Sequence, residues 1–166
     1  RPFAYTAPSG FKALCTQNFD DPLIANAWTA FDVFAETGTG AGKVFTMPGG
    51  FWPDLVWAKS RTNSYNHALY DTVRGATKRL VANSTQAEDT QTQQVPAFSS
   101  TGFTYGTGNP NGSSEAGVFW AWDAGTSDAP SNSDGDIVTT VKVSQTNGFS
   151  IATYTCHGSA NQTLDH

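Results

Sequence analysis

The stretch AGVFWAWDAG, residues 116–125, is the most apolar part of the chain and decides the predicted fold. Its centre, from Val118 to Trp122, contains no polar residue. Successive side chains of a strand point to opposite faces, so both faces of this segment would be apolar. We therefore expect a central strand covered on both sides, with Trp57, Trp120 and Trp122 packed in the core.

Strand-like segments continue in both directions from this stretch. They are separated by Gly, Pro and Asn turn signals at intervals of about ten residues. Strands are also predicted at residues 31–36, 43–47, 54–60, 67–73, 78–83, 102–106, 134–144 and 148–156. The first three are expected to be consecutive antiparallel strands, and residues 84–96 a surface loop. The predicted fold is all-β: an antiparallel β-sandwich of the jelly-roll or concanavalin-like type, with few or no helices.

Composition narrows the functional classes. The 166 residues suffice for one domain with a core. Nine Lys and Arg against fourteen Asp and Glu give a net charge of −5, without the basic cluster that a nucleic-acid interface needs. No run of eighteen apolar residues is present, so no membrane insertion is expected.

The glycine-rich stretch ETGTGAGKVF, residues 36–45, invites a comparison with phosphate-binding loops. A Walker loop requires G-x-x-x-x-G-K-[ST], but Thr37 stands at the first glycine position and Val44 at the Ser/Thr position. The dinucleotide pattern also fails, because Lys43 replaces its last glycine. We therefore predict no nucleotide cofactor, a turn between two strands, and a solvated Lys43.

Other titratable residues do not form a complete catalytic or metal motif. Cys156 and His157 are adjacent but lack an identifiable base. Residues 132–137, NSDGDI, begin like a calcium loop, but a hairpin turn explains them better. Asp71 and Arg74 are expected to pair across a turn for structural reasons. We predict no catalytic residues, no metal site and no cofactor.

A glycosidase would need two facing carboxylates. The candidate acids in this chain are Glu36, Glu88, Asp89 and Glu115. Nothing in the sequence places any two of them at the required separation.

Two of the five tryptophans, Trp28 and Trp52, lie outside the apolar strands and are candidates for glycan contact. The two cysteines, Cys15 and Cys156, are expected to be buried thiols. Whether they form a disulfide stays open, because the sequence does not reveal the redox compartment.

A faint internal repeat appears when Phe31 is aligned with Phe149. The alignment also pairs Thr37 with Thr155 and Gly40 with Gly158. We therefore predict three parts: an end strand and linker from a preceding domain (1–27), a β-sandwich module (28–146), and the start of a second, truncated repeat (147–166).

Three runs carry a resemblance to structural proteins of marine tailed phages, including cyanophages. RPFAYTAPSGFKALCTQNFDDPLI (1–24) resembles the last strand and exit segment of their SPRY-type, concanavalin-like domain. The second run consists of FWPDLVWAKSR with HALYDTVRGATKRL (51–61 and 67–80), together with VFWAWDAG (118–125), and it resembles the repeat module that follows this domain in those proteins. The third run, GFSIATYT (148–155), resembles the start of the next repeat.

The resemblance implies a non-enzymatic virion protein, such as a tail fibre or another host-attachment component. It implies location on the phage particle surface or tail, and other virion proteins as partners. The resemblance also implies a host surface glycan or receptor as a partner, and a homo-oligomer of the trimeric kind common among fibre proteins. Two alternatives remain: a carbohydrate-binding β-sandwich module, distinguished by an exposed Trp28 or Trp52 in a groove, and a glycan-degrading tail enzyme.

Overall fold

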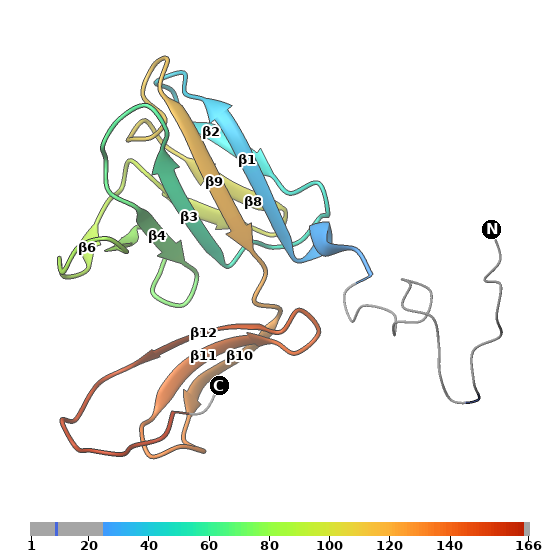
Figure 1. The fold of residues 1–166 in the computed structure, drawn as a ribbon, viewed down its shortest axis with the longest axis vertical. Helices are drawn as coiled ribbons and strands as arrows, with labels where there is room; N and C mark the ends of the chain where they lie inside the picture. The colour runs from blue at the N-terminus through green and yellow to red at the C-terminus, as the bar shows by residue number, and fades with distance from the viewer. Residues whose placement is uncertain (1–8, 10–24, 165–166) are drawn as a thin grey trace.

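The computed structural model describes residue 9 and residues 25–164 and consists largely of strands (Figure 1). The described residues contain no α-helix, only the 3₁₀ turn η2 (Ala27–Thr29). The strands are β1 (Phe31–Thr37), β2 (Lys43–Thr46), β3 (Leu55–Ser60), β4 (Ala68–Asp71), β5 (Lys78–Val81), β6 (Asp89–Thr90), β7 (Ala97–Ser99), β8 (Gly102–Tyr105), β9 (Ala116–Trp122), β10 (Ser127–Asn132), β11 (Thr139–Ser144) and β12 (Phe149–Tyr154). The all-β prediction is confirmed.

Two antiparallel sheets form the sandwich. The larger has the strand order β1-β9-β3-β4-β5-β6, and the smaller has the order β2-β8-β7. Figure 1 shows β2 and β8 behind β1, β9 and β3. The apolar stretch that decided the predicted fold is β9, which pairs with β1 on one side and β3 on the other.

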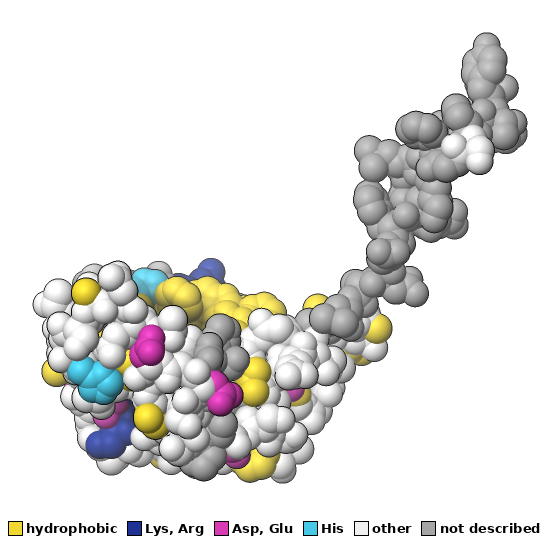
Figure 2. Space-filling model, turned by 90° about the horizontal axis from the view of Figure 1, so that it is seen from below, with side chains coloured by type: hydrophobic (Ala, Val, Ile, Leu, Met, Phe, Trp, Pro, Cys, Tyr) yellow, Lys and Arg dark blue, Asp and Glu magenta, His cyan; other side chains and the backbone are white. Residues whose placement is uncertain are grey.

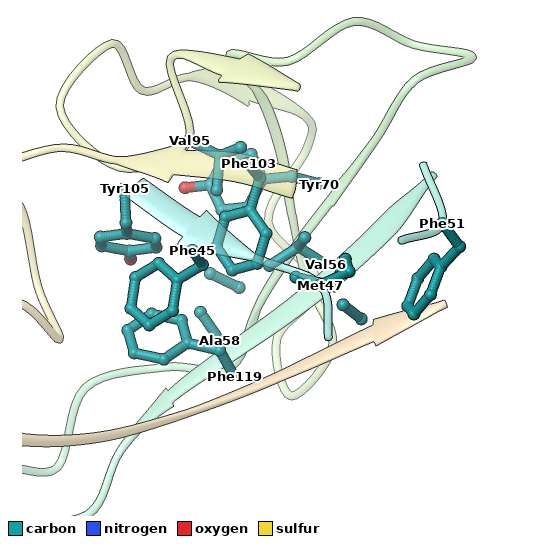
Figure 3. Close-up of a cluster of buried hydrophobic side chains, with 12 residues drawn as sticks. Phe45, Met47, Phe51, Val56, Ala58, Tyr70, Val95, Phe103, Tyr105 and Phe119 are labelled. Atoms are coloured by element: carbon teal, nitrogen blue, oxygen red, sulfur yellow. The ribbon is translucent and has the colours of Figure 1, made fainter. Parts of the chain in front are cut away.

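The core lies between these two sheets and is rich in aromatic rings (Figure 3). Phe45 and Phe103 stack with ring centroids 4.9 Å apart and planes 7° apart. Phe119 of β9 lies 4.7 Å from Phe45 and 4.9 Å from Tyr105. Burial of such large rings is the main stabilising contribution expected for a sandwich of this size.

A third sheet, β10-β11-β12, lies below the sandwich in Figure 1. Phe149 at the start of β12 stacks on Trp122 at the end of β9, with 6.3 Å between ring centroids. The Asn147 side chain donates a hydrogen bond of 2.9 Å to the Asp123 carboxylate. Lys142 of β11 also reaches back to the sandwich. Polar and aromatic contacts therefore join this sheet to the sandwich.

The predicted pairing of the first three strands is wrong. β1 pairs with β9, β2 pairs with β8 in the other sheet, and β3 pairs with β9 and β4. The glycine-rich loop after β1 therefore crosses between the two layers. Its Gly40 has φ +74°, a conformation that favours glycine. Lys43 is not simply solvated, because its Nζ lies 2.9 Å from Glu36 Oε2.

Three strands, β6, β7 and β10, were not predicted. The first two are only two and three residues long, and β6 falls within the expected surface loop. The third is polar, contains Pro130, and has a register shift between Ala129 and Asn132. Proline and irregular pairing are tolerated at sheet edges, where β10 lies.

The prediction that the tryptophans of the large sheet pack in the core is wrong. Trp57, Trp120 and Trp122 are half-buried on the sheet face that points away from β2 and β8. The alternating residues Phe119 and Ala121 are the buried ones. Among the described residues, a second sheet covers only one face of β9, so the prediction of cover on both sides is also wrong.

The boundary predicted at residue 147 falls inside a hairpin. β12 pairs with β11 along its whole length, so residues 149–154 belong to the same sheet as β10 and β11. Gly40 and Gly158, which the repeat alignment pairs, have similar φ values of +74° and +77°. A further repeat beginning here stays a prediction.

The predicted end strand and linker lie mainly in residues 1–24, of which the structure describes residue 9. Cys15 lies outside the described residues.

Cys156, the other cysteine, is exposed and free, so the expectation that it is buried is wrong.

Candidate ligand-binding site

The loop between β2 and β3, MPGGFWPD (47–54), alternates side chains between the core and the surface. Gly50, at φ +70°, closes a turn by donating its N–H to the Met47 carbonyl at 2.9 Å. Phe51 then enters the core, while Trp52 is 46% exposed. The turn thus presents an indole at the surface from a rigidly anchored loop.

Asp54, two residues later, is fully buried. It accepts hydrogen bonds from the Thr72 hydroxyl at 2.8 Å and from the Ala124 N–H at 2.9 Å. Lys142 Nζ, which lies 2.9 Å from Asp54 Oδ1, is a further polar partner of this carboxylate. Burial raises the pKa of the Asp54 carboxyl, and the hydrogen bonds from Lys142 and Thr72 only partly oppose this effect.

Lys142 connects this buried carboxylate to the exposed indole. Its Nζ lies 5.3 Å from the centre of the Trp52 ring, within cation–π distance. It also lies 3.8 Å from Asp128 Oδ1, a more exposed partner on β10. One ammonium group therefore links the β2–β3 loop to two strands of the third sheet.

An open cavity of about 500 Å³ lies where these groups meet, and we call it the Trp52 cavity. Its volume falls within the usual range of small-molecule sites, about 300–1,000 Å³. The sandwich and the third sheet both contribute to its walls. The lining residues are Trp52, Thr72, Val73, Asp128, Thr140, Val141 and Lys142.

The chemistry of the Trp52 cavity suits a ligand with both apolar and hydroxyl-bearing surfaces. The indole offers an apolar face, while the Asp128 carboxylate and the Lys142 ammonium can pair with hydroxyl groups. A sugar ring presents C–H groups on its faces and hydroxyl groups around its edge. The arrangement can therefore stack a sugar ring and hold its hydroxyls at the rim.

The Asp54 environment predicts a pH dependence of stability. The folded-state pKa is raised, so the folded protein binds this proton more tightly than the unfolded chain does. The contribution of the protonated Asp54 carboxyl to the free energy of unfolding is complete below about pH 3.8. It is lost as the pH rises through the pKa of Asp54 in the folded protein. We expect the stability of wild type relative to Asp54→Asn to fall over that pH range. Urea unfolding of both proteins from pH 4 to pH 8 measures this difference, and a rise with pH would contradict the assignment.

The other candidate glycan contact, Trp28, occupies a different environment. It lies in η2 and is 58% exposed. An added Cβ at Gly49 would meet the Trp28 carbonyl oxygen at 2.0 Å, so the backbone there packs closely. Trp28 does not line the Trp52 cavity. The structure therefore separates the two indoles that were grouped by sequence.

The four candidate acids are not brought together at the Trp52 cavity. Glu36 pairs with Lys43, Glu88 with Arg74 and Asp89 with Arg79. Glu115 is buried, and its Oε1 has no hydrogen-bond partner among the described residues. None of these four carboxylates lines that cavity.

The predicted pairing of Asp71 with Arg74 is confirmed, with 2.6 Å between the charged atoms. His67 accepts a hydrogen bond of 3.0 Å from the Trp57 indole N–H. Both contacts therefore serve strand and turn packing.

The NSDGDI segment connects β10 to β11, as the hairpin-turn interpretation requires. Its Asp136 carboxylate accepts hydrogen bonds from the Thr163 N–H and hydroxyl, each at 2.9 Å. Within residues 25–164, no three His, Cys, Asp or Glu side chains are placed to hold a metal ion. His157 is exposed and lies near Gln162.

Sequence reasoning identified Trp52 but missed its neighbours Asp54, Asp128 and Lys142. Asp54 offered a faint signal, because it is an acid directly before the apolar residues 55–58. Lys142 shares an alternating face with Val138 and Thr140 and gave no signal of its own. Asp128 and Lys142 come close to Asp54 and Trp52 only because the third sheet packs against the sandwich.

Comparison with known families gives one match. The model of a domain of unknown function, DUF7483, matches residues 28–166, which include every described strand. No curated protein and no solved structure matches the chain. None of the described helical segments has the length and apolar character to cross a membrane.

Proposed function

The chain belongs to the DUF7483 family, and we propose that it is a non-enzymatic, glycan-binding attachment module of a tailed-phage virion. In this proposal the sandwich is the scaffold and the Trp52 cavity binds a sugar of the host surface. The virion assignment rests on the resemblance of the quoted sequence runs to phage structural proteins. The module would lie on the particle surface or tail, attached to other virion proteins.

The observation that carries the glycan assignment is the position of Trp52. Its indole is half-exposed and lines a cavity whose polar groups, Asp128 and Lys142, stand beside it. The buried Asp54 fixes Lys142, and Lys142 in turn lies over the ring. A pre-organised aromatic surface with a polar rim loses little entropy when a sugar stacks on it.

A glycan-degrading enzyme is the less favoured alternative. That chemistry needs a pair of carboxyl groups flanking the glycosidic bond, about 5–10 Å apart. Among the described residues, Asp128 is the only carboxylate in the lining of the Trp52 cavity. Release of reducing ends from a bound bacterial polysaccharide would favour this alternative over binding alone.

A glycan array tests the proposed function. We expect the full chain to bind a subset of bacterial surface polysaccharides, and Trp52→Ala to lower affinity at least about tenfold through loss of stacking. Trp28→Ala is the matched control, because it removes a similarly exposed indole outside the cavity. Equal losses in both variants, or no binding to any polysaccharide, would contradict the proposal.

A further inference from the structure

A second cavity, of about 160 Å³, lies on the inner face of the large sheet, and we call it the Ala68 cavity. Ala68 is the first residue of β4, whereas Thr72 of the Trp52 cavity follows the last residue of that strand. The two cavities therefore lie at opposite ends of β4. Of the described residues, none lines both cavities.

Small side chains create the Ala68 cavity. On the inner face of the large sheet, Val56 pairs with Tyr70, and both of these side chains are fully buried. The next pair on this face is Ala58 with Ala68, which are also buried but carry only methyl groups. The space that large side chains fill beside Tyr70 therefore stays open beside Ala68.

The Ala68 cavity has the size of one small chemical group. Liquid water occupies about 30 Å³ per molecule, so the cavity has room for about five water molecules or a group of about five non-hydrogen atoms. Tyr65 and Asn66 of the β3–β4 loop are its exposed lining residues and place its opening toward solvent. The remainder of a larger ligand would lie at this opening.

Two N–H donors of the lining residues have no hydrogen-bond partner among the described residues. Arg79 binds the Asp89 carboxylate through Nε and Nη2, at 2.9 Å and 2.6 Å, and its Nη1 group is left over. Gln94 accepts the Tyr70 hydroxyl at Oε1, and its Nε2 group is left over. The cavity thus combines spare donors with the methyl groups of two alanines.

This combination favours one kind of ligand group. A carboxylate would bring in an uncompensated charge, because Asp89 already neutralises Arg79. A hydroxyl group enclosed against Ala58 and Ala68 would lose hydrogen bonds to water on that side. An acetamido group fits both parts of the cavity: its methyl can lie on the two alanines, and its carbonyl oxygen can accept from Arg79 or Gln94.

The charge distribution of the chain agrees with an uncharged ligand. Asp, Glu, Lys and Arg together make up only 14% of the residues. Figure 2 shows one face of the molecule, on which these side chains are few and scattered among hydrophobic and uncharged ones. A ligand that binds through hydrogen bonds and apolar contacts suits such a protein.

We propose that the Ala68 cavity binds the acetamido group of an N-acetylated sugar. The sugar ring would lie at the opening against Tyr65, whose side chain is 45% exposed. The N–H of the ligand would donate to Asn66 or Asn109, both of which line the cavity. This site is additional to the Trp52 cavity, and binding at either one does not depend on the other.

Saturation-transfer difference NMR of the full chain with N-acetylglucosamine tests the proposal. We expect the acetyl methyl protons to receive the strongest saturation, because they would be the most deeply enclosed. Affinity should be in the millimolar range, as a single sugar ring makes few contacts. Glucose, which lacks the acetamido group, should bind at least about tenfold more weakly. Equal binding of the two sugars, or no saturation of the acetyl methyl, would overturn the proposal.

Substitutions at the cavity make the test specific. Ala68→Val adds two methyl groups' worth of bulk to the space and should lower the affinity at least about tenfold. Tyr65→Ala changes an exposed side chain, so the fold should persist while the affinity falls severalfold through loss of stacking. Tyr154→Ala is the matched control, because Tyr154 is 50% exposed and lies outside the cavity.

Two further outcomes would overturn the proposal. One is an affinity that neither Ala68→Val nor Tyr65→Ala lowers more than Tyr154→Ala does. The other is loss of N-acetylglucosamine binding in Trp52→Ala but not in Tyr65→Ala. That second result would place the sugar in the Trp52 cavity and so support the proposed function while removing this additional site.

Discussion

Replacing Lys142 with methionine is expected to lower the free energy of unfolding by about 3–5 kcal/mol, the usual result of removing one partner of a buried ion pair. The ammonium group lies 2.9 Å from the Oδ1 atom of the fully buried Asp54. Methionine keeps most of the stem but leaves the carboxylate without a counter-charge. Urea unfolding followed by circular dichroism at pH 7 measures the loss.

A double variant separates this charge effect from loss of packing. Asp54→Asn combined with Lys142→Met removes both charges, while the amide can still accept the Ala124 hydrogen bond. We expect the double variant to be clearly more stable than Lys142→Met alone. If the two variants are equally unstable, Lys142 stabilises the protein through packing and the ion-pair account is wrong.

Replacing Phe103 with alanine is expected to lower the free energy of unfolding by a similar amount, about 3–5 kcal/mol. Phe103 is 1% exposed and stacks on Phe45 between the two sheets of the sandwich. Removing the ring leaves a cavity that rigid strands on both sides cannot close. Thermal and urea unfolding report the change directly.

Phe98→Ala provides the matched control for that prediction. Phe98 lies directly opposite Phe103 on β7 but is only partly buried at the margin of the core. Its loss should therefore be clearly smaller. Equal losses at the two positions would mean that the core is centred elsewhere than between β8 and β9.

Local sequence patterns predicted most strands but not their partners. The β9 segment was identified because its apolar run is long, and the β11–β12 hairpin because Asn147 and Gly148 form a strong turn signal. Pairing between β1 and β9 joins segments that are far apart in the chain, and no local signal specifies it. The sequence therefore predicted that β1 and β2 pair with each other, whereas the chain crosses from one sheet to the other between them.

The same limit explains the tryptophans. An apolar residue is equally apolar in a core and on an exposed contact surface, so hydrophobicity alone could not place Trp57 or Trp120. Their half-exposure follows from the second sheet covering only the opposite face. Trp52 was identified as a candidate contact because it lies outside the apolar strands, whereas its partners Asp54 and Lys142 come together only through tertiary structure.

The most direct test of the account is to observe which tryptophan a glycan contacts. The chain contains five tryptophans, so a ¹⁵N-labelled sample should give five indole N–H signals in an NMR spectrum. Adding a polysaccharide fragment selected on the glycan array should shift the Trp52 indole and the backbone signals of Thr72 and Lys142. Unchanged Trp52 signals, or shifts confined to Trp28 or to the three tryptophans of the large sheet, would contradict the Trp52 cavity as the binding site.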